Sequence, residues 1–154
     1  MASYFGRGSD TLHATTDKTM INLHATTGVR PKVFHMIISC SATPADSAAH
    51  FLANRTTTKG TGGTEVTAVP ALEGAERASI GTYTPGAFSA EPTYTAGALL
   101  FSCSVYQRHP FQFYANGQAG RLIAPATANN GIGVKSEESN AGTASTLASC
   151  QWIE

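Results

Sequence analysis

Glycines, prolines and turn-forming pairs interrupt this sequence about every ten residues, and this spacing limits what the chain can fold into. The 154 residues include 15 glycines and 7 prolines, and no long stretch between them carries the apolar repeat of an amphipathic helix. Strands need only about four to eight residues of suitable pattern. The sequence therefore predicts an all-β fold of about eight to ten short strands.

The strongest strand signal is segment 33–41, which is rich in β-branched and aromatic residues. In segment 98–107, Phe101, Cys103 and Val105 form the more apolar face and are expected to point into the core. The pair Asn116-Gly117 is expected to join two strands as a hairpin. Further strands are expected at residues 19–24, 47–58, 65–69, 79–84, 111–114, 120–124, 131–136 and 143–153, with loops at 59–63 and 85–92.

A chain of this length fits one domain with a single core. Short strands separated by long Pro/Gly loops favour a β-sandwich, and we expect a jelly-roll-like form of it. The start of the chain lacks a core pattern, yet it contains Tyr4, Phe5 and Leu12. We therefore expect an extended N-terminal arm at residues 1–18 that contacts another subunit, followed by a β-sandwich domain at 19–154.

The charge balance narrows the possible partners. Lys and Arg number 10, Asp and Glu number 10, and charged residues make up only 13% of the chain. A nucleic-acid-binding domain would carry a basic face. The longest apolar run, residues 33–38, is interrupted by His35 and is too short to cross a membrane, and no secretory signal is expected at the polar N-terminus. We expect neither nucleic acid nor membrane as a partner, and a weakly charged surface that lies against other protein.

Residue types that carry catalysis or bind metals do not form a recognisable motif in this sequence. The 5 histidines make no H-x-x-x-H or H-E-x-x-H pattern, and the sequence has no G-x-S-x-G. The 3 cysteines, Cys40, Cys103 and Cys150, lie in apolar or alternating segments and are expected to be buried free thiols. We expect no enzymatic activity, no cofactor and no bound metal.

One glycine-rich segment belongs to a longer pattern. Gly60-Thr61-Gly62-Gly63-Thr64 lacks the Gly-Lys-Ser/Thr of a phosphate-binding loop, so a turn is the simpler interpretation. The ordered pieces around this segment are Asn54-Arg55-Thr56, Val66-Thr67, Pro70-x-Leu72, Gly120-Arg121-Leu122-Ile123-Ala124-Pro125, a strand at 131–134 and Trp152-Ile153-Glu154. This order, from residue 51 onward, resembles small structural proteins of tailed bacteriophages, namely capsid decoration (cement) proteins of the β-sandwich type.

The resemblance implies a virion protein without catalysis, made in the host cytoplasm and bound to the capsid surface. Its partner would be the major capsid protein, and it would form a homo-oligomer, a trimer in preference to a dimer. Such a protein stabilises the shell by bridging neighbouring capsid subunits. The residues expected at interfaces are Tyr4, Phe5, Arg7 and Leu12 in the arm and Gly60, Thr61, Gly62 and Gly63 in the loop.

Two alternatives remain open. A phage tail or baseplate component, or a receptor-binding tip, would present exposed aromatic residues on loops, for which Tyr83, Phe88 and Tyr94 are the candidates. A small cupin-like metalloenzyme on a jelly-roll scaffold would need His and Glu ligands on neighbouring strands, and the histidines here lie on segments without a matching Glu.

Overall fold

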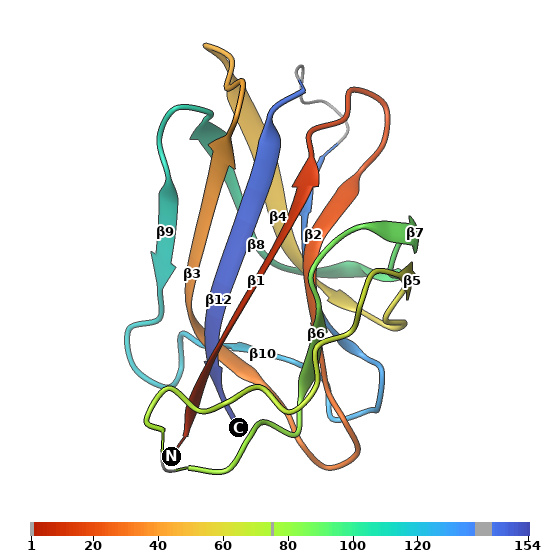
Figure 1. The fold of residues 1–154 in the computed structure, drawn as a ribbon, viewed down its shortest axis with the longest axis vertical. Helices are drawn as coiled ribbons and strands as arrows, with labels where there is room; N and C mark the ends of the chain where they lie inside the picture. The colour runs from red at the N-terminus through yellow and green to blue at the C-terminus, as the bar shows by residue number, and fades with distance from the viewer. Residues whose placement is uncertain (1, 75, 138–142) are drawn as a thin grey trace.

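The computed structural model describes residues 2–74, 76–137 and 143–154, which contain strands and no helix (Figure 1). The strands are β1 Ser3–Thr11, β2 Lys18–His24, β3 Lys32–Ser41, β4 Ala48–Thr56, β5 Thr61–Gly62, β6 Thr82–Thr84, β7 Phe88–Ala90, β8 Tyr94–Tyr106, β9 Phe111–Tyr114, β10 Leu122–Ile123, β11 Gly131–Ser136 and β12 Ser145–Ile153. The all-β prediction is confirmed.

Most strands belong to two five-stranded antiparallel sheets, which face each other in Figure 1. Sheet A has the order β1-β12-β3, and β9 and β10 both pair with β3. Sheet B has the order β6-β2-β11-β4-β8. The short strands β5 and β7 pair with each other in the connection between β4 and β8. The fold is therefore a β-sandwich with long loops on one side.

Side chains from both sheets meet in one core between them. In β12, alternate residues are buried, because successive side chains of a strand point to opposite faces. Trp152 of β12 is fully buried between Tyr4 and Tyr83, at ring-centroid distances of 5.7 Å and 6.0 Å. At the far side, Phe101 of sheet B lies 5.1 Å from Phe111 of sheet A. Aromatic rings therefore close the sandwich at both sides.

The alternation expected in β8 is confirmed. Val105 is buried in the core, and Phe101 and Cys103 pack against it from the same face. Ser102 and Ser104, between them, are exposed. The two-residue period was sufficient to predict which side chains of β8 point inward, because one face of this strand meets the core and the other meets solvent.

The prediction of an arm at residues 1–18 is wrong. Ser3–Thr11 forms β1, which pairs with β12 along its whole length, and Tyr4 and Leu12 are buried in the same core as the rest of the chain. Gly6 and Gly8 share the inward face with Tyr4. A side chain at Gly8 would place its Cβ 2.0 Å from the Met20 carbonyl oxygen, so glycine is what lets β1 lie against β2. The sandwich domain thus begins at β1, not at residue 19.

The hairpin expected at Asn116-Gly117 is also wrong. The flanking strands β9 and β10 pair with successive parts of β3 rather than with each other. Gly117 does have the positive φ of a turn residue, at 77°. The local signal therefore identified a bend correctly, but tertiary pairing with β3 decided which strands meet.

Residues 65–69 do not form the expected strand. Val66 makes an isolated bridge with Tyr83, and Ala68 has a φ of 51°, which breaks extended backbone. The Ser79 hydroxyl accepts a hydrogen bond from the Val69 N–H at 3.0 Å. The segment is held by loop contacts of this kind, which its β-branched composition does not reveal.

Candidate functional site

The two outer faces of the sandwich differ in how far the chain covers them. On sheet B, the outward residues Asn22 and His24 are buried beneath the connection between β4 and β8. Thr82 of the neighbouring strand β6 lies 2.9 Å from His24 Nδ1 on the same face of the sheet. On sheet A, Phe5 is 41% exposed and Tyr114 is 70% exposed. Sheet A therefore offers an accessible outer face, while the exposed large apolar side chains of sheet B, Leu99 and Tyr106, lie in its edge strand β8.

A row of four side chains runs across that accessible face. Strand pairing aligns Phe5 with Gln151, Gln151 with His35, and His35 with Tyr114, so the row crosses β1, β12, β3 and β9. The rings of His35 and Tyr114 lie 5.8 Å apart. We call these four residues the sheet A row. Two large rings at its ends, with two polar side chains between them, suit contact with another protein.

A second row beside it is more polar. It aligns Arg7 with Ser149, Ser149 with Ile37, and Ile37 with Gln112. The Gln112 side-chain nitrogen lies 2.7 Å from His35 Nε2, which joins the two rows. Arg7 and Gln112 are exposed. The two rows thus combine aromatic area with hydrogen-bonding groups and the positive charge of Arg7 in the edge strand β1.

The predicted interface residues of the first strand separate into two groups. Phe5 and Arg7 lie on the accessible face of sheet A, where contact with a partner stays a prediction. Tyr4 and Leu12 are wrong as interface residues, because they are 0% and 2% exposed inside the chain's own core. Successive residues of β1 point to opposite faces, which separates the buried residues from the exposed ones. In the sequence, this alternation is visible as the Tyr-Phe-Gly-Arg-Gly pattern. Gln151, His35 and Tyr114 had no such signal, because only strand pairing brings them together.

The predicted loop residues lie elsewhere. Thr61, Gly62 and Gly63 are exposed, and Gly60 is half-buried, at the β5–β7 pair beside sheet B. Gly62 has a φ of 85°, and a Cβ on it would come within 2.4 Å of the Ser89 N–H nitrogen. Glycine is therefore required for the shape of this loop. The structure does not bring the loop together with Phe5 and Arg7 on sheet A.

An open pocket of about 520 Å³ adjoins this loop. Its lining includes four threonines and three other polar residues: Thr57, Thr58, Thr61, Thr93, Lys59, Glu91 and Asn129. Lys59 forms a 2.7 Å ion pair with Glu65. The lining is hydroxyl-rich and its charged groups already have partners within the chain.

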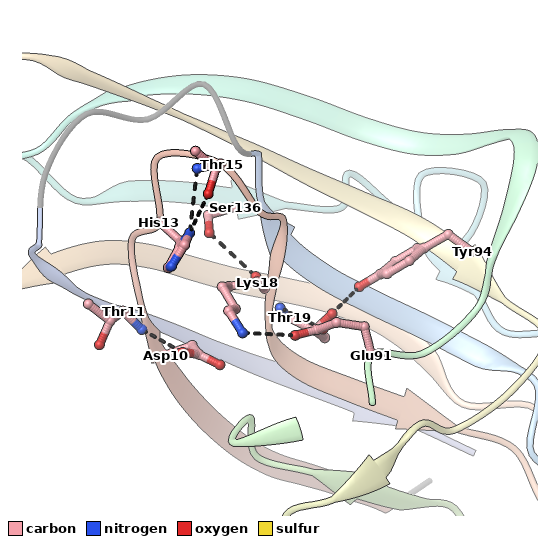
Figure 2. A network of polar contacts seen from close by, with 9 residues as sticks. All are labelled: Asp10, Thr11, His13, Thr15, Lys18, Thr19, Glu91, Tyr94 and Ser136. Carbon is pink, nitrogen blue, oxygen red and sulfur yellow. Dashed lines mark hydrogen bonds and ion pairs between the residues drawn. The ribbon is translucent and has the colours of Figure 1, made fainter. Parts of the chain in front are cut away.

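Glu91 belongs to a polar network that attaches the β7–β8 connection to sheet B (Figure 2). Its carboxylate accepts a hydrogen bond from the Thr19 N–H at 3.1 Å and lies 3.9 Å from the Lys18 ammonium. The Thr19 hydroxyl lies 2.8 Å from the Tyr94 hydroxyl, and burial raises the pKa of Tyr94 well above its ordinary value. These contacts explain how the loop is held against the sheet, and they leave Tyr94 as a neutral structural group.

The loop aromatics proposed for a receptor-binding tip do not project into solvent. Phe88 is 8% exposed, and Tyr83 packs on Trp152. Tyr94 lies beneath the Lys135 ammonium, 4.8 Å from its ring centroid. These three rings therefore contribute to the internal packing of the loops and do not form an exposed glycan platform.

Potential catalytic groups lie in unfavourable surroundings. Burial raises the pKa of the Cys103 thiol to about 11 and that of Cys150 to about 12, which disfavours the reactive thiolate. The Ser104 hydroxyl lies 2.6 Å from His50 Nδ1 beside a hollow of about 430 Å³. Ser104 lies inside the extended strand β8, however, and not at the sharp strand-to-helix turn that presents a nucleophilic serine in hydrolases.

Among the residues that the structure describes, no group of His, Cys, Asp and Glu side chains is arranged to hold a metal ion. In the same residues, no helix is long and apolar enough to cross a membrane. Comparison with known proteins adds no identification: no family model, no curated protein and no solved structure matches this chain. The surface of the sandwich and the sequence pattern are therefore the features that point to a function.

Proposed function

We propose that this protein is a non-enzymatic component of a phage virion that binds the outside of the capsid and stabilises it by bridging capsid subunits. The observation that carries the proposal is the sheet A row, Phe5, Gln151, His35 and Tyr114, on the accessible face of the sandwich. The resemblance of residues 51–154 to capsid decoration proteins names the class of partner. The major capsid protein would lie against this face, and the bound chain would reside on the capsid surface.

The strand order supports a jelly-roll scaffold. Four antiparallel pairs nest inside one another along the chain: β1 with β12, β2 with β11, β3 with β9, and β4 with β8. The β3–β12 and β4–β11 pairings then join these strands into the two sheets. Nested pairs of this kind arise when one long antiparallel hairpin wraps around a core, as in the double Greek key of a jelly roll, a fold common in viral capsids.

Capsid stabilisation requires contact area rather than chemistry. Aromatic rings such as Phe5 and Tyr114 supply large buried area at low cost in side-chain entropy, while Gln151 and His35 can pair with polar groups of a partner. Homo-oligomeric copies bind more tightly than single ones, because the second attachment is effectively intramolecular. Weak contacts at each subunit then suffice to hold a shell together.

The first test is location. Antibody against this chain, used to label negatively stained virions that carry it, should mark the head surface. Virions lacking the protein should lose the label and show heads that rupture at lower temperature. Label confined to the tail, or absent from particles, would contradict the proposal.

The second test is the face itself. The double variant Phe5→Ala/Tyr114→Ala should lower occupancy on purified heads by about tenfold or more, since truncating interface aromatics typically costs more than about 1 kcal/mol each. The matched control is Leu72→Ala/Ile80→Ala, which removes two side chains that are 56% and 44% exposed but lie outside sheet A. Equal occupancy for the two double variants would exclude the sheet A row from the contact.

A further inference from the structure

The outer edge of β8 is a second surface that the fold leaves without a partner. β8 ends sheet B, and its only strand neighbour among the described residues is β4. Between Phe101 and Tyr106 the pairing with β4 is regular, whereas the register shifts before Phe101. The regular segment Phe-Ser-Cys-Ser-Val-Tyr therefore presents a straight, unpaired side.

The direction of the backbone groups in this segment follows from two hydrogen bonds. The Gln107 N–H donates to the Ser47 carbonyl at 3.1 Å, so Gln107 faces β4. Backbone groups alternate along an antiparallel strand, so Val105 and Cys103 also face β4. The His50 carbonyl, opposite Ser104, accepts from the Glu137 N–H at 3.0 Å, on the side away from β8. Ser102 and Ser104 consequently direct their N–H and C=O groups outward.

The other sheet ends in the described part of the chain are short or covered. β6 has three residues, and Val66 bridges Tyr83 on its free side. β9 has four residues and β10 has two. β1 lies against β2 and the turn at Gly86, where a Cβ would come within 2.2 Å of the Ser9 carbonyl oxygen. β8, with 13 residues, is the long edge that remains.

This edge lacks the usual protection against pairing. Exposed edge strands normally carry a charged residue, a proline or a bulge that prevents a second chain from adding to the sheet. Residues 101–106 contain no charge and no proline, and the bulge lies just before them. The side chains of Ser102 and Ser104 are small and exposed, so they leave room for another strand.

We propose that β8 pairs with β8 of a second copy of this chain, antiparallel, about a twofold axis at Cys103. Ser102 then faces Ser104 of the partner subunit, and each such pair exchanges two backbone hydrogen bonds. The same register sets Phe101 beside the partner's Val105, so apolar side chains meet on one face and serines on the other. Sheet B continues from one subunit into the next.

A second copy is the occupant that fits this edge best. The serine pattern is symmetric about Cys103, which is what an isologous contact requires. The chain has zero formal net charge, so two copies do not repel each other. A register centred on Ser102 would pair Ser104 with Leu100, which lies in the bulge and cannot offer a regular edge. This contact does not depend on the proposal that the protein is a virion component. It predicts a twofold-symmetric dimer, whereas the resemblance to decoration proteins implies a trimer.

Two double variants that differ in one side chain test both the contact and its register. Ser102→Lys/Ser104→Lys sets Lys opposite Lys twice across the axis, whereas Ser102→Lys/Ser104→Glu sets Lys opposite Glu twice. Both variants lose the Ser104–His50 hydrogen bond equally. Sedimentation across a dilution series should give a dimer for the unmodified chain and for the Lys/Glu variant. The Lys/Lys variant should dimerise about tenfold more weakly or worse.

Hydrogen exchange tests the contact without any substitution, so its result does not depend on how a variant changes the structure of the monomer. In the unmodified chain, the Ser102 and Ser104 amides should exchange more slowly as concentration rises, while the exposed Gln112 amide in sheet A should not change. Monomers of the unmodified chain at all concentrations would overturn the proposal. So would a dimer that the Lys/Lys variant forms as readily as the Lys/Glu variant, because that dimer would use another surface. A trimer with unprotected Ser102 would also overturn it.

Discussion

The indole ring of Trp152 lies 5.7 Å from the phenol ring of Tyr4, and both side chains are completely buried. Strand pairing sets these two residues directly opposite each other, so the first and last strands of the chain share one part of the core. The beginning of the chain is therefore structural. Deleting residues 2–10 would expose Trp152 and would report on folding, not on docking to a partner.

Replacing Trp152 with Ala should destabilise the protein by about 3–5 kcal/mol, because a large buried ring leaves a cavity that the surrounding strands fill only partly. Urea unfolding followed by circular dichroism measures this change. Tyr114→Ala is the matched control, since it removes an aromatic ring that is 70% exposed, and it should cost less than about 0.5 kcal/mol. Similar losses for the two variants would contradict the burial of Trp152.

Replacing Gly8 with Ala should destabilise the protein by about 3 kcal/mol or more, although it adds only one methyl group. The new Cβ would lie 2.0 Å from the Met20 carbonyl oxygen and 2.8 Å from Pro85 Cα, and backbone atoms cannot move aside cheaply. Ser9→Ala, at the neighbouring exposed position, should be nearly neutral. Thermal unfolding compares the two, and a Gly8→Ala protein as stable as the control would show that β1 does not approach β2 this closely.

Strand positions were predictable for β2, β3, β4, β8 and β11, because each lies in a segment of strand-forming residues between turn signals. In β8, alternation also identified the face that meets the core. The misplaced elements have a common physical origin. Whether Ser3–Thr11 is an arm or an edge strand depends on its pairing with β12. Even the closest pair in sequence, Thr11 with Ser145, is separated by more than 130 residues. Likewise, β9 and β10 are separated because both need β3. Local sequence carries no information on such distant pairing.

The candidate surfaces were only partly visible in the sequence. Phe5 and Arg7 were identifiable because a frayed terminus is usually less aromatic, and because aromatic residues and arginine dominate the energetics of interfaces. Tyr114, His35 and Gln151 are far apart in sequence, and strand register alone aligns them with Phe5. The free edge of β8 is likewise a property of sheet order, because any strand in the interior of a sheet can have the same sequence.

The stability of the protein should fall as the pH drops below about 6.5, and His24 should account for part of the slope. Burial lowers the pKa of His24 below its ordinary value of 6.5, with the Glu65 carboxylate opposing that change. The unfolded chain therefore binds a proton at a pH where the folded chain does not, so the free energy of unfolding decreases as pH falls. His24→Gln should flatten the profile between about pH 7 and pH 5 relative to the exposed-site control His13→Gln. A profile identical to that of the control would mean that His24 binds a proton equally readily in the folded and unfolded protein.

Thiol labelling should distinguish Cys150 from the other cysteines and report on global unfolding. Cys150 is 3% exposed, and burial raises its pKa to about 12, so an alkylating reagent at pH 8 has neither access nor thiolate to react with in the folded state. Labelling must then pass through opening of β12, which is paired on both sides by β1 and β3. If that opening is global, Trp152→Ala should accelerate Cys150 labelling about a hundredfold, in line with a loss of about 3 kcal/mol. Mass spectrometry of the labelled peptides measures each rate. Fast labelling of Cys150 in the unmodified protein, unaffected by Trp152→Ala, would show that the C-terminal strand opens locally and that the Tyr4–Trp152 contact does not hold the two ends of the chain together.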